Sequence, residues 1–268
     1  MIFRQFFNYA SHSFTYLLAD SETLSAVLID PLIENNGQYV ELINELGLTL
    51  EAAIDTHSHN SRSSAVEVLH HLWGCQAIVG SPNNSEWATR IVSDGDIIEV
   101  GELALKAIHT HGHTADSYSY YLEYKGDSLV LTGDTLLIRS TGRADLDDGD
   151  AGQQYQSLVE KLLTLPEATH VYPAHDYRGW AKSTISEERQ FNSRLQVNDV
   201  VAYCNLMDEL NISGNTLMDE VELLSQSPLP SSPAAATSPV IEKPKDIPAA
   251  PPAKDDTPPT EEAVPSWR

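Results

Sequence analysis

The sequence contains little cysteine, few basic residues and no long apolar run. Only two cysteines, Cys75 and Cys204, occur in 268 residues, and they form no CxxC pair or disulfide framework, which is typical of a reducing compartment. The 16 Lys and Arg residues face 39 Asp and Glu residues, giving a formal net charge of −23. This charge argues against nucleic acid or an anionic membrane as a partner, and an acidic, solubilising surface is the simpler interpretation.

Signals for export and for membrane insertion are missing as well. The first ten residues lack the basic start and apolar core of a secretory signal, and no apolar run approaches the length of a membrane span. We therefore expect a soluble, cytoplasmic protein.

Proline is scarce in most of the chain and concentrated at its end. Eleven of the 15 prolines follow Ser227, in a stretch rich in Ala, Ser, Asp and Glu. Such a stretch buries too little apolar surface to offset the entropy of ordering it. We expect one folded domain over residues 1–226, which is long enough for a single layered core, and a disordered acidic, Pro-rich tail over residues 227–268.

Hydrophobic patterning before the tail predicts an α/β protein, an αββα sandwich in which two sheets lie between layers of helices. In this arrangement the polar motifs of the sequence follow strand ends along one edge. The predicted strands are 13–19, 26–30, 52–56, 76–80, 97–100, 103–109, 118–124, 128–132 and 170–172. The predicted helices are 40–46, 66–73, 155–163, 185–194, 198–210 and 217–225.

Histidine and aspartate follow four of these predicted strands. The candidates are His57 and His59 in His-Ser-His, His113 in Gly-His-Thr, Asp134 in Gly-Asp-Thr and His175 in Pro-Ala-His-Asp. Residues i and i+2 of an extended segment point the same way, so the first two imidazoles can converge on one ion. Each residue alone has an ordinary structural explanation, but together they indicate a metal centre.

Two sets of metal ligands are compatible with this spacing. His57, His59 and His113 would form a three-His zinc site, which lowers the pKa of a bound water toward neutrality. His57, His113 and Asp134 would form a two-His-one-carboxylate face, which suits non-haem Fe(II) with open positions. The spacing alone does not choose between them.

The order of these motifs resembles the metallo-β-lactamase superfamily. The usual string of that superfamily, His-x-His-x-Asp-His, is altered here, because Ser61 and Arg62 replace its Asp and last His. The resemblance implies that these two positions help to hold a second metal, so a two-zinc hydrolase site is impaired. Arg62 either places a positive charge near the second-metal position or turns outward on the following helix.

Longer motifs resemble the persulfide dioxygenase family, which is related to glyoxalase II, over most of residues 1–215. The family implies one iron bound by His57, His113 and Asp134, and oxidation of glutathione persulfide by O₂ to sulfite and glutathione. His59 and His175 would then orient ligands or exchange protons. The motifs that carry the resemblance are Ile29-Asp30-Pro31, Asp55-Thr56-His57, Thr132-Gly133-Asp134-Thr135-Leu136-Leu137-Ile138-Arg139, Gly142-Arg143-Ala144-Asp145 and Tyr172-Pro173-Ala174-His175-Asp176-Tyr177.

Two further residues are candidates for binding glutathione. Arg143 has a planar guanidinium that can bind a carboxylate in bidentate fashion, although an ion pair with Asp145 or Asp147 explains it equally well. Tyr177 either donates to the glutathione backbone or only packs.

We therefore predict a mono-iron persulfide dioxygenase. One alternative is a mono-zinc hydrolase of glutathione thioesters, and another is a non-catalytic descendant that binds a thiol ligand or a partner. The altered string at Ser61 and Arg62 favours the descendant, whereas the intact Asp134 argues against it. A homodimer is an expectation from the family alone.

Overall fold

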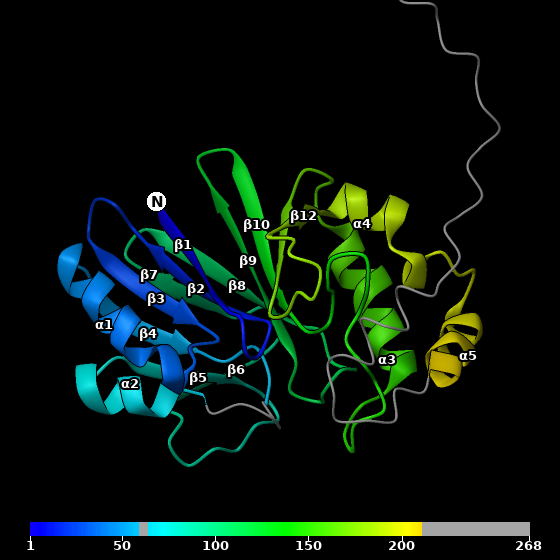
Figure 1. The fold of residues 1–268 in the computed structure, drawn as a ribbon, viewed down its shortest axis with the longest axis horizontal. Helices are drawn as coiled ribbons and strands as arrows, with labels where there is room; N and C mark the ends of the chain where they lie inside the picture. Colours follow the sequence, from blue (N-terminus) through cyan, green and yellow to red (C-terminus); the bar gives the residue numbers. More distant parts are fainter. Residues whose placement is uncertain (59–63, 211–268) are drawn as a thin grey trace, which may run out of the picture. The chain divides into compact units, whose positions relative to one another are not determined.

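The computed structural model describes residues 1–58 and 64–210, which all belong to one unit, Met1–Gln226. The predicted helix over 217–225, the tail over 227–268 and the domain boundary between 226 and 227 lie outside the described residues. The described chain forms two six-stranded sheets between outer helices (Figure 1). No helix in this described part is long and apolar enough to cross a membrane.

The first sheet takes its strands from the N-terminal part of the chain, in sequence order. Its first three strands are antiparallel, and the third to sixth are parallel to one another. The strands are β1 (Ile2–Asn8), β2 (Ser13–Ala19), β3 (Ser25–Ile29), β4 (Thr49–Ile54), β5 (Gln76–Gly80) and β6 (Arg90–Val92).

The second sheet follows in the chain and has the order β12-β11-β10-β9-β8-β7. All neighbours are antiparallel except β10 and β11, which are parallel. The strands are β7 (Ile97–Val100), β8 (Leu103–His109), β9 (Tyr118–Tyr124), β10 (Asp127–Gly133), β11 (His170–Pro173) and β12 (Ser183–Thr184).

Alternating apolar side chains divide the core into three layers. Along β2, Tyr16 and Leu18 face the second sheet, whereas Leu17 faces the helices, as the two-residue period of a strand requires. The outer face of the first sheet packs on α1 (Asn36–Glu45) and α2 (Val66–Trp73). That of the second sheet packs on α4 (Ile185–Phe191), α5 (Val200–Leu210) and the turns that follow α3 (Ala151–Gln156). The predicted αββα sandwich is therefore confirmed.

Several elements differ from the predictions: besides β1, the short strands β6 and β12 had not been predicted, and α1 begins at Asn36 rather than at Val40. β1 was not expected, because its apolar residues do not alternate and no glycine marks the turn after it. Asn8 makes the turn instead, since its side-chain oxygen accepts the backbone N–H of Ala10 and Ser11. The helix predicted over 155–163 begins earlier, at α3, because Asp150 caps it by accepting the backbone N–H of Gln153. It then continues as a π-helical turn over Ser157–Lys161.

Candidate metal centre

Four strands from both sheets deliver polar side chains to one edge of the sandwich. His57 follows β4, His113 follows β8, Asp134 follows β10 directly, and His175 follows β11. All four residues are at most 9% exposed. The predicted arrangement of the motifs along one edge is therefore present.

Three of these residues are close enough to bind a single ion. The Nε2 atoms of His57 and His113 each lie 3.6 Å from Oδ2 of Asp134. One ligand atom from each residue lies within 4.8 Å of the other two, and the two imidazole rings are 5.0 Å apart at a steep angle. This is the two-His-one-carboxylate set of the sequence analysis.

Hydrogen bonds on the far side of both rings fix how they present their nitrogens. The Thr56 hydroxyl donates to Asp30, so its oxygen accepts from Nδ1 of His57 at 2.9 Å. Nδ1 of His113 donates to the backbone carbonyl of Arg143 at 2.7 Å. A proton on each Nδ1 leaves the lone pair of each Nε2 directed at Asp134. The donor set therefore fits a divalent metal ion.

His175 supports the carboxylate rather than joining the three ligands. Its Nδ1 lies 2.6 Å from Oδ1 of Asp134, while the other carboxylate oxygen faces the two imidazoles. Burial raises the pKa of the Asp134 carboxyl, but the positive charge of His175 when it is protonated and its hydrogen bond outweigh burial. The charges of His57 and His113, when these rings are protonated, act in the same direction, so the pKa of Asp134 lies well below its usual range. The carboxylate is thus available as an anionic ligand.

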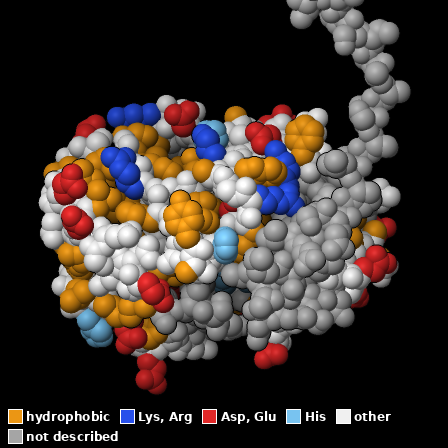
Figure 2. All heavy atoms as spheres, in the orientation of Figure 1, with side chains coloured by type: hydrophobic (Ala, Val, Ile, Leu, Met, Phe, Trp, Pro, Cys, Tyr) orange, Lys and Arg blue, Asp and Glu red, His pale blue; other side chains and the backbone are white. Residues whose placement is uncertain are grey.

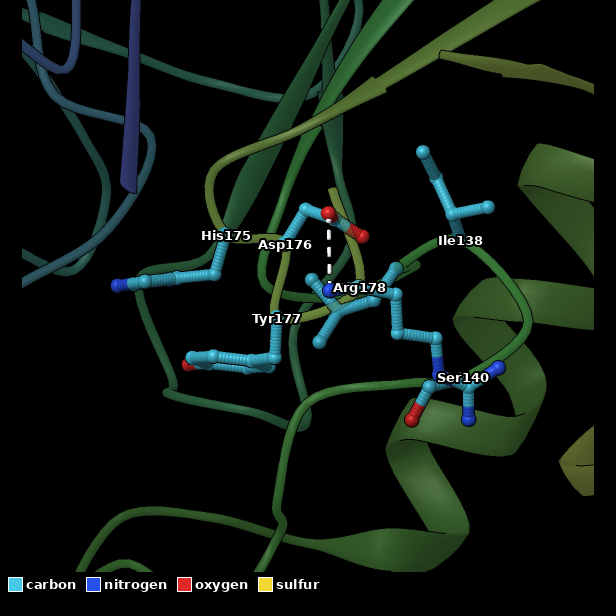
Figure 3. A pocket seen from close by; sticks show the side chains of 7 residues that line it. Ile138, Ser140, His175, Asp176, Tyr177 and Arg178 are labelled. Carbon is cyan, nitrogen blue, oxygen red and sulfur yellow. Dashed lines mark hydrogen bonds between the residues drawn. The ribbon is translucent and has the colours of Figure 1, made fainter. Parts of the chain in front are cut away.

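Tyr177 forms a wall next to this centre. Its ring stacks on that of His175, with 6.0 Å between centroids and 14° between planes, and Figure 3 shows the two side chains extending side by side. Asp176 extends to another side, where it accepts the backbone N–H of Arg178 at 3.1 Å. His175, Asp176 and Tyr177 line a small cavity together with Leu137, Ile138 and Ser140.

The backbone carbonyl of Arg143 contacts His113 at the candidate centre, whereas the side chain of Arg143 forms an ion pair. Its Nε and Nη2 donate to the two oxygens of Asp145 at 2.6 and 2.7 Å. This is one of the ion pairs considered in the sequence analysis. Arg143 also lines a cavity of about 180 Å³ between the loop over 143–150 and α5, whose described wall includes Met207 and Asp208.

Some predicted residues are not described, and some residues of the site were not predicted. His59, Ser61 and Arg62 lie outside the described residues. Asp116, which accepts hydrogen bonds from the loops that carry two of the candidate ligands, was missed because no motif marks it, and Gly142 was named only as part of the Gly142-Arg143-Ala144-Asp145 motif, with no role of its own. The only signal of Asp116 in the sequence is that it lies three residues after His113.

Comparisons with known proteins give the class of this chain. Residues 9–175 match the metallo-beta-lactamase superfamily. The chain belongs to this superfamily, as its fold and the ligands at its strand ends indicate.

The relatives narrow this class. The human protein named "Persulfide dioxygenase ETHE1, mitochondrial" is 39% identical over 213 residues, which are 79% of this chain and 82% of that protein. The crystal structure of ETHE1 from Myxococcus xanthus is 40% identical, with a TM-score of 0.75 over 79% of this chain and 92% of that one. The chain belongs to the persulfide dioxygenase family.

A more distant relative represents the hydrolase branch. Hydroxyacylglutathione hydrolase from Prochlorococcus marinus is 32% identical over 158 residues, covering 57% of this chain and 61% of that protein. The similarity to ETHE1 is therefore both higher and longer. The expected cytoplasmic location stays a prediction, and the human relative is named as mitochondrial.

Proposed function

We propose that this chain is a persulfide dioxygenase that uses one non-haem ferrous ion and O₂ to convert glutathione persulfide into sulfite and glutathione. The observation that carries the proposal is the buried set of His57, His113 and Asp134, with both Nε2 atoms 3.6 Å from the same carboxylate oxygen. Two imidazoles and one carboxylate suit Fe(II) with open positions. The likeness to ETHE1 supports the substrate class.

The residues around this set have distinct proposed roles. When bound, Fe(II) would supply open positions at which a persulfide sulfur and O₂ meet, which makes a three-body encounter intramolecular. His175 holds Oδ1 of Asp134, so it would fix the orientation of the carboxylate and exchange protons beside it. His59 is proposed for the same kind of role on the strength of its place in the sequence.

Arg143 and Tyr177 are proposed to contact glutathione. The cavity of about 180 Å³ lined by Arg143 adjoins the loop that holds His113, so a glutathione carboxylate in it would share the guanidinium with Asp145 or displace this partner. The phenol of Tyr177 lies beside His175 and can donate to a peptide carbonyl of the substrate.

A mono-zinc thioester hydrolase is supported less well. Its three-His site needs His59, whereas the ligand set in the described part of the chain includes a carboxylate. A non-catalytic descendant has no need for three buried, converging ligand side chains. The dioxygenase is therefore the better proposal, and the homodimer remains an expectation.

The test is to purify the protein anaerobically, measure its iron and zinc, and follow O₂ uptake with glutathione persulfide. We expect about one iron per chain, as a single three-ligand site predicts, and O₂ consumption that depends on the persulfide. Asp134→Asn should lose both. Asp127→Asn, at the exposed opposite end of β10, is the matched control and should lose neither.

Other results would exclude the proposal. Zinc without O₂ uptake, together with cleavage of a glutathione thioester, would establish the hydrolase. A protein that binds neither metal would be a binding protein.

A further inference from the structure

A second buried carboxylate, Asp116, lies next to the metal centre. It is 5% exposed and belongs to the loop between β8 and β9, three residues after His113. The function proposed above gives it no role. Its surroundings indicate a role, because Asp116 accepts hydrogen bonds from three different loops.

Four donors converge on the two oxygens of Asp116. Oδ1 accepts the backbone N–H of Ser58 at 3.1 Å and the Thr114 hydroxyl at 2.8 Å. Oδ2 accepts the Ser58 hydroxyl and the Asn83 amide, the latter at 2.9 Å. These donors lie in the loops that follow β8, β4 and β5. One carboxylate therefore joins the segments that carry His57 and His113.

The orientation of Asn83 is fixed independently. Its side-chain oxygen accepts the backbone N–H and the hydroxyl of Ser85, at 2.9 and 2.7 Å. The amide NH₂ must then be the group that points at Asp116. The third loop is thus part of the same network.

The hydrogen bonds on either side of His57 follow the same pattern. Thr56 donates its backbone N–H and its hydroxyl to Asp30, and Ser58 donates the same two groups to Asp116. The backbone that carries the imidazole is therefore held from both sides by a buried carboxylate. Asp116 also holds a residue next to His113, because it accepts from Thr114.

Asp116 is ionised at neutral pH. Burial raises the pKa of its carboxyl, but the hydrogen bonds from Ser58, Thr114 and Asn83 outweigh burial and bring this pKa below its usual value. An ionised carboxylate accepts only, so all four donors can point inward. An amide in its place has one acceptor oxygen and turns two N–H donors toward the same groups.

We infer that Asp116 is a positioning residue, which sets the spacing of His57 and His113 through Ser58 and Thr114 and so determines how tightly the centre binds metal. The inference rests on the proposed metal centre. It assigns Asp116 no contact with the metal or the substrate. Residues that orient metal ligands typically change metal affinity by about 10- to 100-fold when they are replaced.

The test compares Asp116→Asn with the unmodified full-length protein, using Fe(II) and Co(II) as probes. We expect the dissociation constant for Fe(II), measured anaerobically against a competing chelator, to rise about 10- to 100-fold. The visible absorption bands of bound Co(II) should shift as well, because they report the geometry of the ligands. A purely structural role would leave these bands unchanged.

Asp20→Asn is the matched control. Asp20 is also buried, at 1% exposed, and accepts two backbone N–H groups, from Glu22 and Glu102, and the Thr23 hydroxyl. It follows β2 at the end opposite to Ser13, which bridges to His175. This variant should lose stability but keep the Fe(II) affinity and the Co(II) spectrum.

Each outcome separates this inference from the proposed function. If the unmodified protein binds no metal, the proposed function fails. If it binds metal and Asp116→Asn keeps the same affinity and spectrum, only the inference fails. Should Asp116→Asn not fold, Asn83→Ala removes one of the four donors and should weaken Fe(II) binding a few-fold, as one hydrogen bond predicts. An unchanged affinity in Asn83→Ala would then overturn the inference.

Discussion

Hydrogen bonds on the outer side of each candidate ligand orient the atoms that would bind a metal ion. The Thr56 hydroxyl and the Arg143 carbonyl fix the tautomers of His57 and His113, and His175 fixes Asp134. An imidazole that is held in this way already directs its lone pair at the ligand position, so it loses little conformational entropy when a metal binds. The geometry of the candidate centre therefore depends on the hydrogen-bond partners of the ligands as much as on the ligands themselves.

The altered string at Ser61 and Arg62 gives a prediction about metal stoichiometry. The double change Ser61→Asp, Arg62→His restores a carboxylate and an imidazole of the superfamily string and removes a positive charge. We expect zinc binding to rise from one toward two ions per chain, measured by elemental analysis after dialysis against zinc.

Persulfide turnover of the iron-loaded double variant should stay within about threefold of the original, because the three proposed iron ligands are unchanged. A manyfold gain in turnover would instead show that the natural residues impair the enzyme. Binding of only one zinc would contradict the first part of the prediction.

The three candidate ligands could be proposed from the sequence, but the atoms that orient them could not. His57, His113 and Asp134 each follow a predicted strand, and a polar residue just after an apolar strand can be recognised in a single sequence. The group that orients His113 is the backbone carbonyl of Arg143. Every residue has such a carbonyl, so the sequence does not reveal this contact. Asp116 acts across 58 residues of sequence on Ser58, and only the folded chain shows this contact.

Loops, rather than strands, determine the fine geometry at the scale of the elements. The predicted strands 76–80, 97–100, 103–109 and 118–124 coincide with the observed ones, because their apolar residues face a core. The loop after β10 has no such pattern. It nevertheless returns to the centre, where the backbone N–H of Gly142 donates to the carbonyl of Asp134 at 2.8 Å.

Gly142 must therefore remain a glycine. A Cβ at this position would lie 2.2 Å from the backbone oxygen of Asp134 and 2.9 Å from Nδ1 of His113, which is closer than atoms can approach. We expect Gly142→Ala to displace the loop, to lower the unfolding temperature and to weaken Fe(II) binding at least about tenfold. Thermal unfolding and chelator competition measure the two effects.

The same substitution at Gly37 is the control. Gly37 lies in α1 and has open space around its added Cβ. Gly37→Ala should stabilise the protein by about 0.5–1 kcal/mol and leave metal affinity unchanged. Equal metal affinity in Gly142→Ala would show that the loop can move without affecting the ligands.

The whole molecule brings four distant strand ends together because two sheets face each other. β4 belongs to the first sheet and β8, β10 and β11 to the second, so the centre forms only when both sheets pack. The backbone N–H of Tyr118 ties them by donating to the carbonyl of Thr56 at 2.7 Å. The acidic side chains are scattered over the described part of the face in Figure 2, in agreement with a solubilising role for the net charge of −23.

The tail gives the last prediction, which concerns the domain boundary. The Pro-rich sequence after Ser227 contains little apolar surface that could be buried in a core. A chain ending at Gln226 should keep its iron content and unfold within about 2 °C of the full-length protein, because the composition of the removed residues leaves them little apolar surface to bury. A chain ending at Asp199 also loses Tyr203, which is buried and hydrogen-bonded to Thr141 and Gln154, and it should unfold at a much lower temperature. If the first truncation lowers the unfolding temperature as much as the second, the tail packs on the domain and the boundary is misplaced.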